Sequence, residues 1–161
     1  MSATIERPDQ IYAALAAISG DILLLPNLAV AEVLPREPLE TFDNAPDWFA
    51  GMLMWHGRRV PIISFEKLNG NLASLQPNRR ARMLVVYATG NRIQSGMFGM
   101  LTEGYPHLVT LNRNAVRPEP LRGSDRPELV AARARVASQV PAIPNFECIE
   151  AEVATVMQRL N

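Results

Sequence analysis

Thirteen prolines divide this chain of 161 residues into short segments. They run from Pro8 to Pro144 and form no proline-rich block. Because proline lacks the backbone N–H and clashes with the preceding helical turn, it ends helices and interrupts sheet ladders. Prolines at this spacing therefore favour many short strands over a few long helices.

The apolar runs between these prolines have the length and composition of strands. We expect strands at 22–25, 28–34, 51–55, 60–65, 83–87, 97–101 and 108–111. Gly57 supplies the positive φ that a tight hairpin turn needs between two of them. Pro61 should face a sheet edge, since it cannot donate to a ladder. Gly90 and Asn91 have the composition of a two-residue turn.

Two segments carry apolar residues at helical spacing. The first, 126–139, has Pro127 near its start, where a helix tolerates proline. The second, 150–160, begins with acidic residues and has Arg159 near its end, as the helix dipole prefers. Segment 11–18 suits a helix or a strand. The sum is about eight to ten strands with one or two helices, which predicts a mainly β, barrel-like domain.

Length and composition predict a single domain over residues 1–161. The one cysteine, Cys148, excludes an internal disulfide, and its apolar neighbours favour a small buried side chain. No apolar stretch approaches the ~20 residues of a membrane-spanning helix, and the polar start does not resemble a signal peptide. We therefore expect a soluble cytoplasmic protein without direct membrane insertion.

Catalytic motifs are missing from the sequence. It contains neither the GxxxxGK[ST] phosphate loop nor the GxSxG nucleophile turn. The two histidines, His56 and His107, lie far apart and show no metal-ligand spacing with Cys148. We expect no metal, no cofactor and no enzymatic activity.

Two other classes of function stay open at this level. Residues 58–139 carry most of the basic side chains, including Arg79, Arg80 and Arg82, so a small nucleic-acid-binding barrel is one alternative. Few aromatic residues are available for base stacking, which argues against it and predicts no nucleic-acid partner. An enzyme of unrecognised type is the other alternative, and it would need a deep pocket with perturbed titratable groups.

Several motifs resemble the CheW-like family of chemosensory adaptors in order and spacing. They are Val30-Ala31-Glu32-Val33, the run from Gly51 to Phe65, Phe98 to Tyr105, and Val116 to Pro120. The likeness is clearest over residues 20–120. Leu24-Leu25-Pro26-Asn27 followed by Val30-Ala31-Glu32-Val33 also resembles the ChpC type, which serves type IV pilus systems and twitching motility.

The resemblance implies two packed five-stranded SH3-like barrels with a C-terminal helix and no active site. It implies an adaptor that binds a chemoreceptor signalling tip and the regulatory domain of a CheA-type histidine kinase. By matched position, the receptor-binding candidates are Val30, Glu32, His56, Gly99, Tyr105 and Leu108. The kinase-binding candidates are Asn27, Ala50 and Gly51.

Plain structural roles stay open for several of these residues. Val30 and Leu108 suit a barrel core, Glu32 suits a solvated strand end, and Gly51 and Gly99 suit tight backbone geometry.

The sequence departs from the family pattern at three places. His56 stands where the family usually has an arginine tied to receptor binding, and Ser64 replaces an aspartate. The segment 122–139 replaces the usual link into the last strand and helix. A histidine ring cannot supply the two-pronged charged contact of an arginine, so the departure at His56 bears on the choice of partner.

Overall fold

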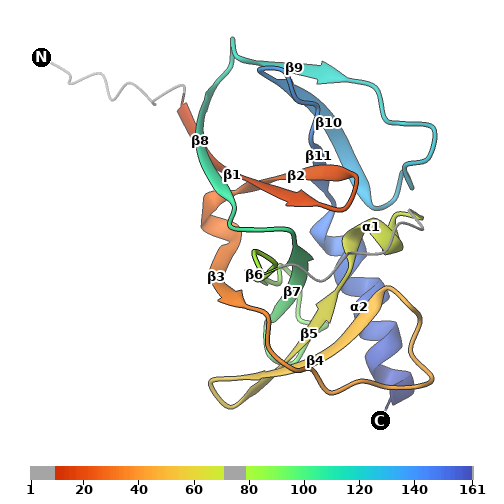
Figure 1. The fold of residues 1–161 in the computed structure, drawn as a ribbon. Helices are drawn as coiled ribbons and strands as arrows, with labels where there is room; N and C mark the ends of the chain where they lie inside the picture. The colour runs from red at the N-terminus through yellow and green to blue at the C-terminus, as the bar shows by residue number, and fades with distance from the viewer. Residues whose placement is uncertain (1–9, 71–78, 161) are drawn as a thin grey trace, which may run out of the picture.

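The computed structural model describes residues 10–70 and 79–160, which form two β-sheets and two α-helices (Figure 1). The first sheet has the order β8 (His107–Asn112), β1 (Gln10–Ile18), β2 (Asp21–Pro26), β11 (Ala142–Pro144), β10 (Val130–Val136), β9 (Val116–Glu119). The second has the order β3 (Val30–Pro35), β6 (Arg82–Tyr87), β7 (Met97–Thr102), β5 (Arg58–Ile63), β4 (Phe49–Trp55). The prediction of a mainly β fold with a C-terminal helix is confirmed.

Three helical segments complete the fold: the 3-10 turn η1 (Asn27–Ala29), the short helix α1 (Phe65–Leu68) and the C-terminal helix α2 (Phe146–Leu160). The predicted helix at 150–160 is therefore correct, and it begins four residues earlier than expected. Asn145 caps its first turn, because the Asn145 Oδ1 accepts a hydrogen bond from the Cys148 backbone N–H at 3.2 Å.

The largest apolar core lies where the two sheets meet α2. It combines Leu23 and Leu25 of the first sheet with Phe98 and Met100 of the second, and Ile149 of α2 packs against them. A second apolar cluster is formed mainly by residues of the second sheet. A third, smaller cluster lies on the face of the first sheet that points away from the largest core. Cys148 is half-buried against the largest core.

Residues 11–18, which suit either structure by sequence, lie within β1. This strand pairs with β2 on one side and with β8 on the other, so its backbone groups are used on both edges. The predicted hairpin at Gly57 is also present, with φ +73 at that glycine. Pro61 does not lie on an edge strand as expected, because β5 lies between β4 and β7. The pairing of β5 with β7 begins at Ile62, immediately after Pro61, which has no N–H to contribute.

The expected helix over 126–139 is wrong. Its central part is β10, which pairs with β9 and β11 and gives the first sheet one strand more than expected. A register shift between Val130 and Ala132 breaks the alternation of the strand. Buried residues therefore fall at 130, 133, 134 and 136, a spacing that resembles a helical face.

The expected two-residue turn at Gly90 and Asn91 is also wrong, because a longer loop joins β6 to β7. The fully buried carboxylate of Glu150 in α2 holds this loop. It accepts hydrogen bonds from the Thr89 N–H, from the Thr89 hydroxyl at 3.1 Å and from the Gly90 N–H at 2.9 Å. The loop is thus anchored to the C-terminal helix.

Arg133 of β10 is buried against two carboxylates, those of the nearby Asp125 and of Asp21, which is 112 residues away. Its guanidinium makes two hydrogen bonds of 2.7 Å to Asp125 and bonds of 2.8 and 2.9 Å to Asp21. Asn69, which follows α1, donates to Asp125 at 3.1 Å. The hydrogen bonds from Arg133 lower the pKa of Asp125 from 3.8 to about 2. This network ties the first sheet to α1.

Candidate partner-binding surface

Large apolar side chains gather along the outer strands β8 and β3, beside β1 and η1. Leu28 is 90% exposed, Leu108 71%, Tyr12 65% and Tyr105 60%. Soluble proteins rarely leave such side chains together in water unless another molecule covers them. We call the surface formed by Tyr12, Leu28, Val30, Tyr105 and Leu108 the β3–β8 surface.

Strand register brings Tyr12 and Leu108 onto the same face. Leu108 lies directly opposite Ala14, and Tyr12 is two residues from Ala14 along β1. Side chains at such diagonal positions are close enough to form one contact area. Because Ala13 pairs with Pro26 at the end of β2, Tyr12 lies beside the turn that contains Leu28.

The start of β3 continues this surface. Val30 is half-buried and packs against the main core, while Glu32 is exposed. The pairing of β3 with β6 shifts between Val30 and Glu32, so Ala31 is a bulge residue. The Glu32 carboxylate accepts a hydrogen bond from the neighbouring Val33 N–H at 3.3 Å. The start of β3 thus offers the half-buried Val30 side chain and the exposed Glu32 carboxylate.

Tyr105 lies at the far end of β3. The guanidinium carbon of Arg82 stands 4.6 Å from the centre of the Tyr105 ring, a cation–π distance. Arg82 pairs with Pro35, the last residue of β3, so Tyr105 is placed beside that end of the strand. Of the three basic residues considered for nucleic acid, Arg79 and Arg80 are exposed and Arg82 is half-buried in this contact.

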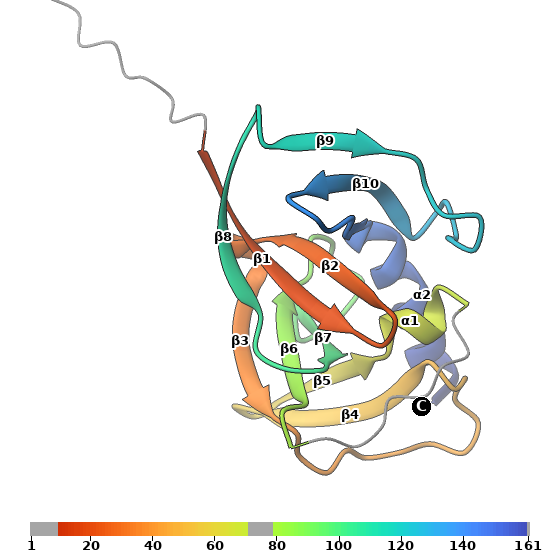
Figure 2. The same ribbon diagram turned by 45° about the horizontal axis from the view of Figure 1, so that its top comes forward.

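His56 lies at the tip of the β4–β5 hairpin. It is exposed, has a φ of +49, and its ring packs edge-on against Trp55 with 4.5 Å between centroids. In both views this tip lies at the same end of the second sheet as the end of β3 (Figures 1 and 2). Its position therefore allows His56 to border the β3–β8 surface without joining its apolar centre.

Gly99 is not on the surface. It is buried in β7 between β6 and β5, and a Cβ atom there would lie 2.4 Å from the Ile62 Cδ1. A side chain at this position would push Ile62 aside, so the observed role of Gly99 is steric. Its placement among the receptor-binding candidates gains no support from this geometry.

The three kinase-binding candidates lie on two different elements. Asn27 begins η1 and is half-buried, whereas Ala50 and Gly51 belong to β4. Gly51 is buried with a φ of +150, and a Cβ there would lie 2.5 Å from the backbone oxygen of Glu40. Gly51 can therefore contact a partner only through its backbone or its neighbours.

The comparisons agree with this architecture. The model of the CheW-like domain family matches residues 14–150. This chain belongs to the CheW-like family. Its fold is similar to that of the scaffolding protein TtCheW from Thermoanaerobacter tengcongensis, with a TM-score of 0.73 and 14% identity over 91% of each chain. The comparison with curated proteins gave no match.

Two contributors to the surface of this CheW-like domain were not among the sequence candidates. Tyr12 stands in an alanine-rich run whose structure was ambiguous, and Leu28 sits in a strand run that reads as core. Only the pairing of β1 with β8 and the turn at η1 expose them. The one sequence feature that could have indicated this surface is the aromatic Tyr12 in a segment of mostly small residues.

The surface is suited to binding another chain. Its side chains are apolar or aromatic and offer no nucleophile. Within residues 10–70 and 79–160, no group of three or more His, Cys, Asp or Glu side chains is placed to hold a metal ion. Neither described helix is long and apolar enough to cross a membrane.

Proposed function

We propose that this CheW-like domain is a non-catalytic cytoplasmic adaptor that couples a chemoreceptor signalling tip to a CheA-type histidine kinase. The observation that carries the proposal is the exposure of Tyr12 and Leu108 on one face of the first sheet, with the exposed Leu28 in the neighbouring turn η1. Family membership supports a chemosensory role, and the apolar surface supports recognition of a protein partner rather than of nucleic acid.

The receptor tip would bind as a helical hairpin laid against the β3–β8 surface. An amphipathic helix presents apolar side chains every three or four residues, and these match a row of exposed apolar groups on a sheet edge. Full burial of one large apolar side chain stabilises a complex by about 1.5–3 kcal/mol before the cost of association. Tyr12 and Leu108, which are more than half exposed, are thus the expected energetic centre.

Strand β1 offers a matched pair of variants for testing this contact. Tyr12 is 65% exposed and its neighbour Ile11 is 63% exposed, but successive strand residues point to opposite faces. Tyr12→Glu should weaken binding of a purified receptor-tip fragment at least about tenfold in calorimetry, whereas Ile11→Glu should leave it within twofold. Equal loss in both variants, or no binding by the native chain, would contradict a receptor contact here.

The kinase would bind mainly on the outer strand β4 around Ala50, whereas the third candidate, Asn27, adjoins Leu28 of the β3–β8 surface. The proposal rests on the matched positions Asn27, Ala50 and Gly51 and on the edge position of β4 in the second sheet. Ala50→Arg should weaken binding of the kinase regulatory domain and leave binding of the receptor fragment unchanged. Tyr12→Glu should weaken binding of the receptor fragment and leave binding of the kinase domain unchanged. Loss of both partners in either variant, with an unchanged melting temperature, would mean that the two sites are not separate.

The motif likeness to the ChpC type supports a place in a type IV pilus system. A strain without this chain should then lose twitching motility and keep flagellar swimming. The native chain should restore twitching, and the Tyr12→Glu chain should not. Loss of swimming with intact twitching would assign the adaptor to the flagellar system instead.

A further inference from the structure

The first sheet encloses an apolar pocket on the face opposite the β3–β8 surface. β8 and β9 stand at opposite ends of its strand order, yet a short turn at 113–115 joins them. The sheet must curl for this turn to close, which makes its inner face concave (Figure 2). The hollow has a volume of about 410 Å³, within the range of small-molecule sites.

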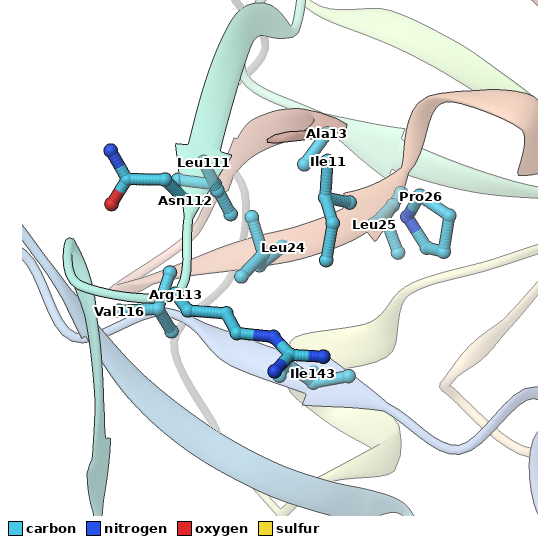
Figure 3. A pocket seen from close by; sticks show the side chains of 10 residues that line it. All are labelled: Ile11, Ala13, Leu24, Leu25, Pro26, Leu111, Asn112, Arg113, Val116 and Ile143. Carbon is cyan, nitrogen blue, oxygen red and sulfur yellow. The ribbon is translucent and has the colours of Figure 1, made fainter. Parts of the chain in front are cut away.

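The lining of this pocket is almost entirely aliphatic. It is formed by side chains from β1, β2, β9 and β11 and from the end of β8 (Figure 3): Ile11, Ala13, Leu24, Leu25, Pro26, Leu111, Asn112, Arg113, Val116 and Ile143. The small side chain of Ala13 leaves space at the floor. Water is held poorly in such a space because it finds few hydrogen-bond partners, so an apolar ligand gains from filling it.

One charged side chain, Arg113, lines the pocket. Within the described part of the chain, no ion pair or hydrogen bond engages its guanidinium, and the residue is exposed. In Figure 3 its side chain extends across the mouth in the direction of Ile143, while Asn112 points away. The Asn112 Oδ1 accepts from the Ala115 N–H at 2.8 Å and so serves the turn. The pocket thus combines an aliphatic interior with one cation at its rim.

We propose that this pocket binds a small amphipathic anion, with its apolar chain inside the first sheet and its carboxylate on Arg113. The Arg113 guanidinium, unpaired among the described residues, and the aliphatic hollow together favour this ligand over a neutral or cationic one. The site is separate from the β3–β8 surface, so the inference does not depend on the adaptor function.

Three probes of equal chain length test the charge preference: octanoate, octanol and octylammonium. Octanoate should bind one molecule per chain in calorimetry, about three- to fivefold tighter than octanol, as expected for a contact with a solvent-exposed charge. Octylammonium should bind most weakly. Arg113→Gln should remove the preference for octanoate and leave octanol unchanged. Arg117→Gln, which removes a different exposed arginine, located in β9, should retain the preference for octanoate.

Two pocket-filling variants test the location. Val116→Phe fills the rim and Ala13→Leu fills the floor, and both should abolish binding of octanoate and octanol while the circular dichroism spectrum stays native. Unchanged binding in both folded variants, or equal affinity for all three probes, would overturn the proposal. Binding that appears only after removal of residues 1–9 would also overturn it, because the chain's own segment would then be the occupant.

Discussion

Replacement of Asp125 by asparagine is predicted to cost about 3 kcal/mol of folding free energy. The side chains of Asp125 and Arg133 are each only 1% exposed, and two hydrogen bonds of 2.7 Å join them. Asparagine keeps the size of aspartate but places an N–H₂ group against a donor of Arg133 or Asn69. Removal of one partner of a buried ion pair typically costs about 3–5 kcal/mol, and the remaining contact of Arg133 with Asp21 moderates the loss.

The lowered pKa of Asp125 corresponds to a similar magnitude. It falls from 3.8 to about 2, chiefly through the hydrogen bonds from Arg133. Since each tenfold change in proton affinity is worth about 1.4 kcal/mol, the ionised form stabilises the fold by about 2–3 kcal/mol. For a carboxyl with a lowered pKa, this stability is fully present above the unfolded value and is lost as pH falls toward the folded value.

Urea unfolding of the native chain and of Asp125→Asn tests both statements. The difference in unfolding free energy should be about 3 kcal/mol at pH 7, stay constant down to about pH 5, and shrink below about pH 4. Glu119→Gln is the matched control, because its partner Arg135 is also on β10 but the pair is partly exposed, so the loss should stay below about 1 kcal/mol. A difference below about 1 kcal/mol for Asp125→Asn at pH 7, or one that does not change with acid, would refute the reasoning.

Three further predictions concern other positions. Gly51→Ala should lower the free energy of unfolding in urea by more than about 2–3 kcal/mol, because the new Cβ would clash with the Glu40 backbone oxygen. Gly57→Ala, with open space around it, should lower it by only about 1–2 kcal/mol. Equal losses of unfolding free energy in the two variants would contradict this. His56→Arg should tighten binding of ordinary chemotaxis receptors, measured by calorimetry, by about 1–2 kcal/mol. Binding of these receptors by the native chain should weaken little as the salt concentration rises. Unchanged affinity in both His56→Arg and His56→Ala would show that this residue is not part of the site. Burial raises the pKa of Glu66, so its charge destabilises the fold as pH rises above about 4.5, and Glu66→Gln should gain stability relative to the native chain between pH 4 and pH 7; a pH-independent difference would contradict this.

The sequence was sufficient to predict the elements whose partners follow from local chemistry. The seven apolar runs expected as strands correspond to β2 to β8, and the amphipathic spacing over 150–160 lies within the helix α2. The order and spacing of the motifs led to the CheW-like family, whose model matches residues 14–150. These features depend on side chains close in the chain, so a linear pattern retains them.

The sequence misled where a distant residue changes the environment of a side chain. Arg133 lies in the segment expected as a helix, but it is buried in a strand, where Asp21, 112 residues away, and Asp125 both bind its guanidinium. Because Arg133 is buried and a bulge follows Val130, the buried residues of strand β10 have a spacing that resembles one face of a helix. No local sequence pattern predicts that the Asp21 carboxylate lies beside Arg133.

The candidate sites follow the same division. Motif matching named Val30, Tyr105 and Leu108, but only the pairing of β1 with β8 adds Tyr12 to the face of Leu108. The pairing of β7 with β5 and β6 buries Gly99 in the second sheet. The aliphatic pocket has no sequence signature, since its lining residues read as ordinary strand core. It exists because the two end strands of the first sheet are joined by one short turn, and the resulting curvature is a property of the tertiary structure alone.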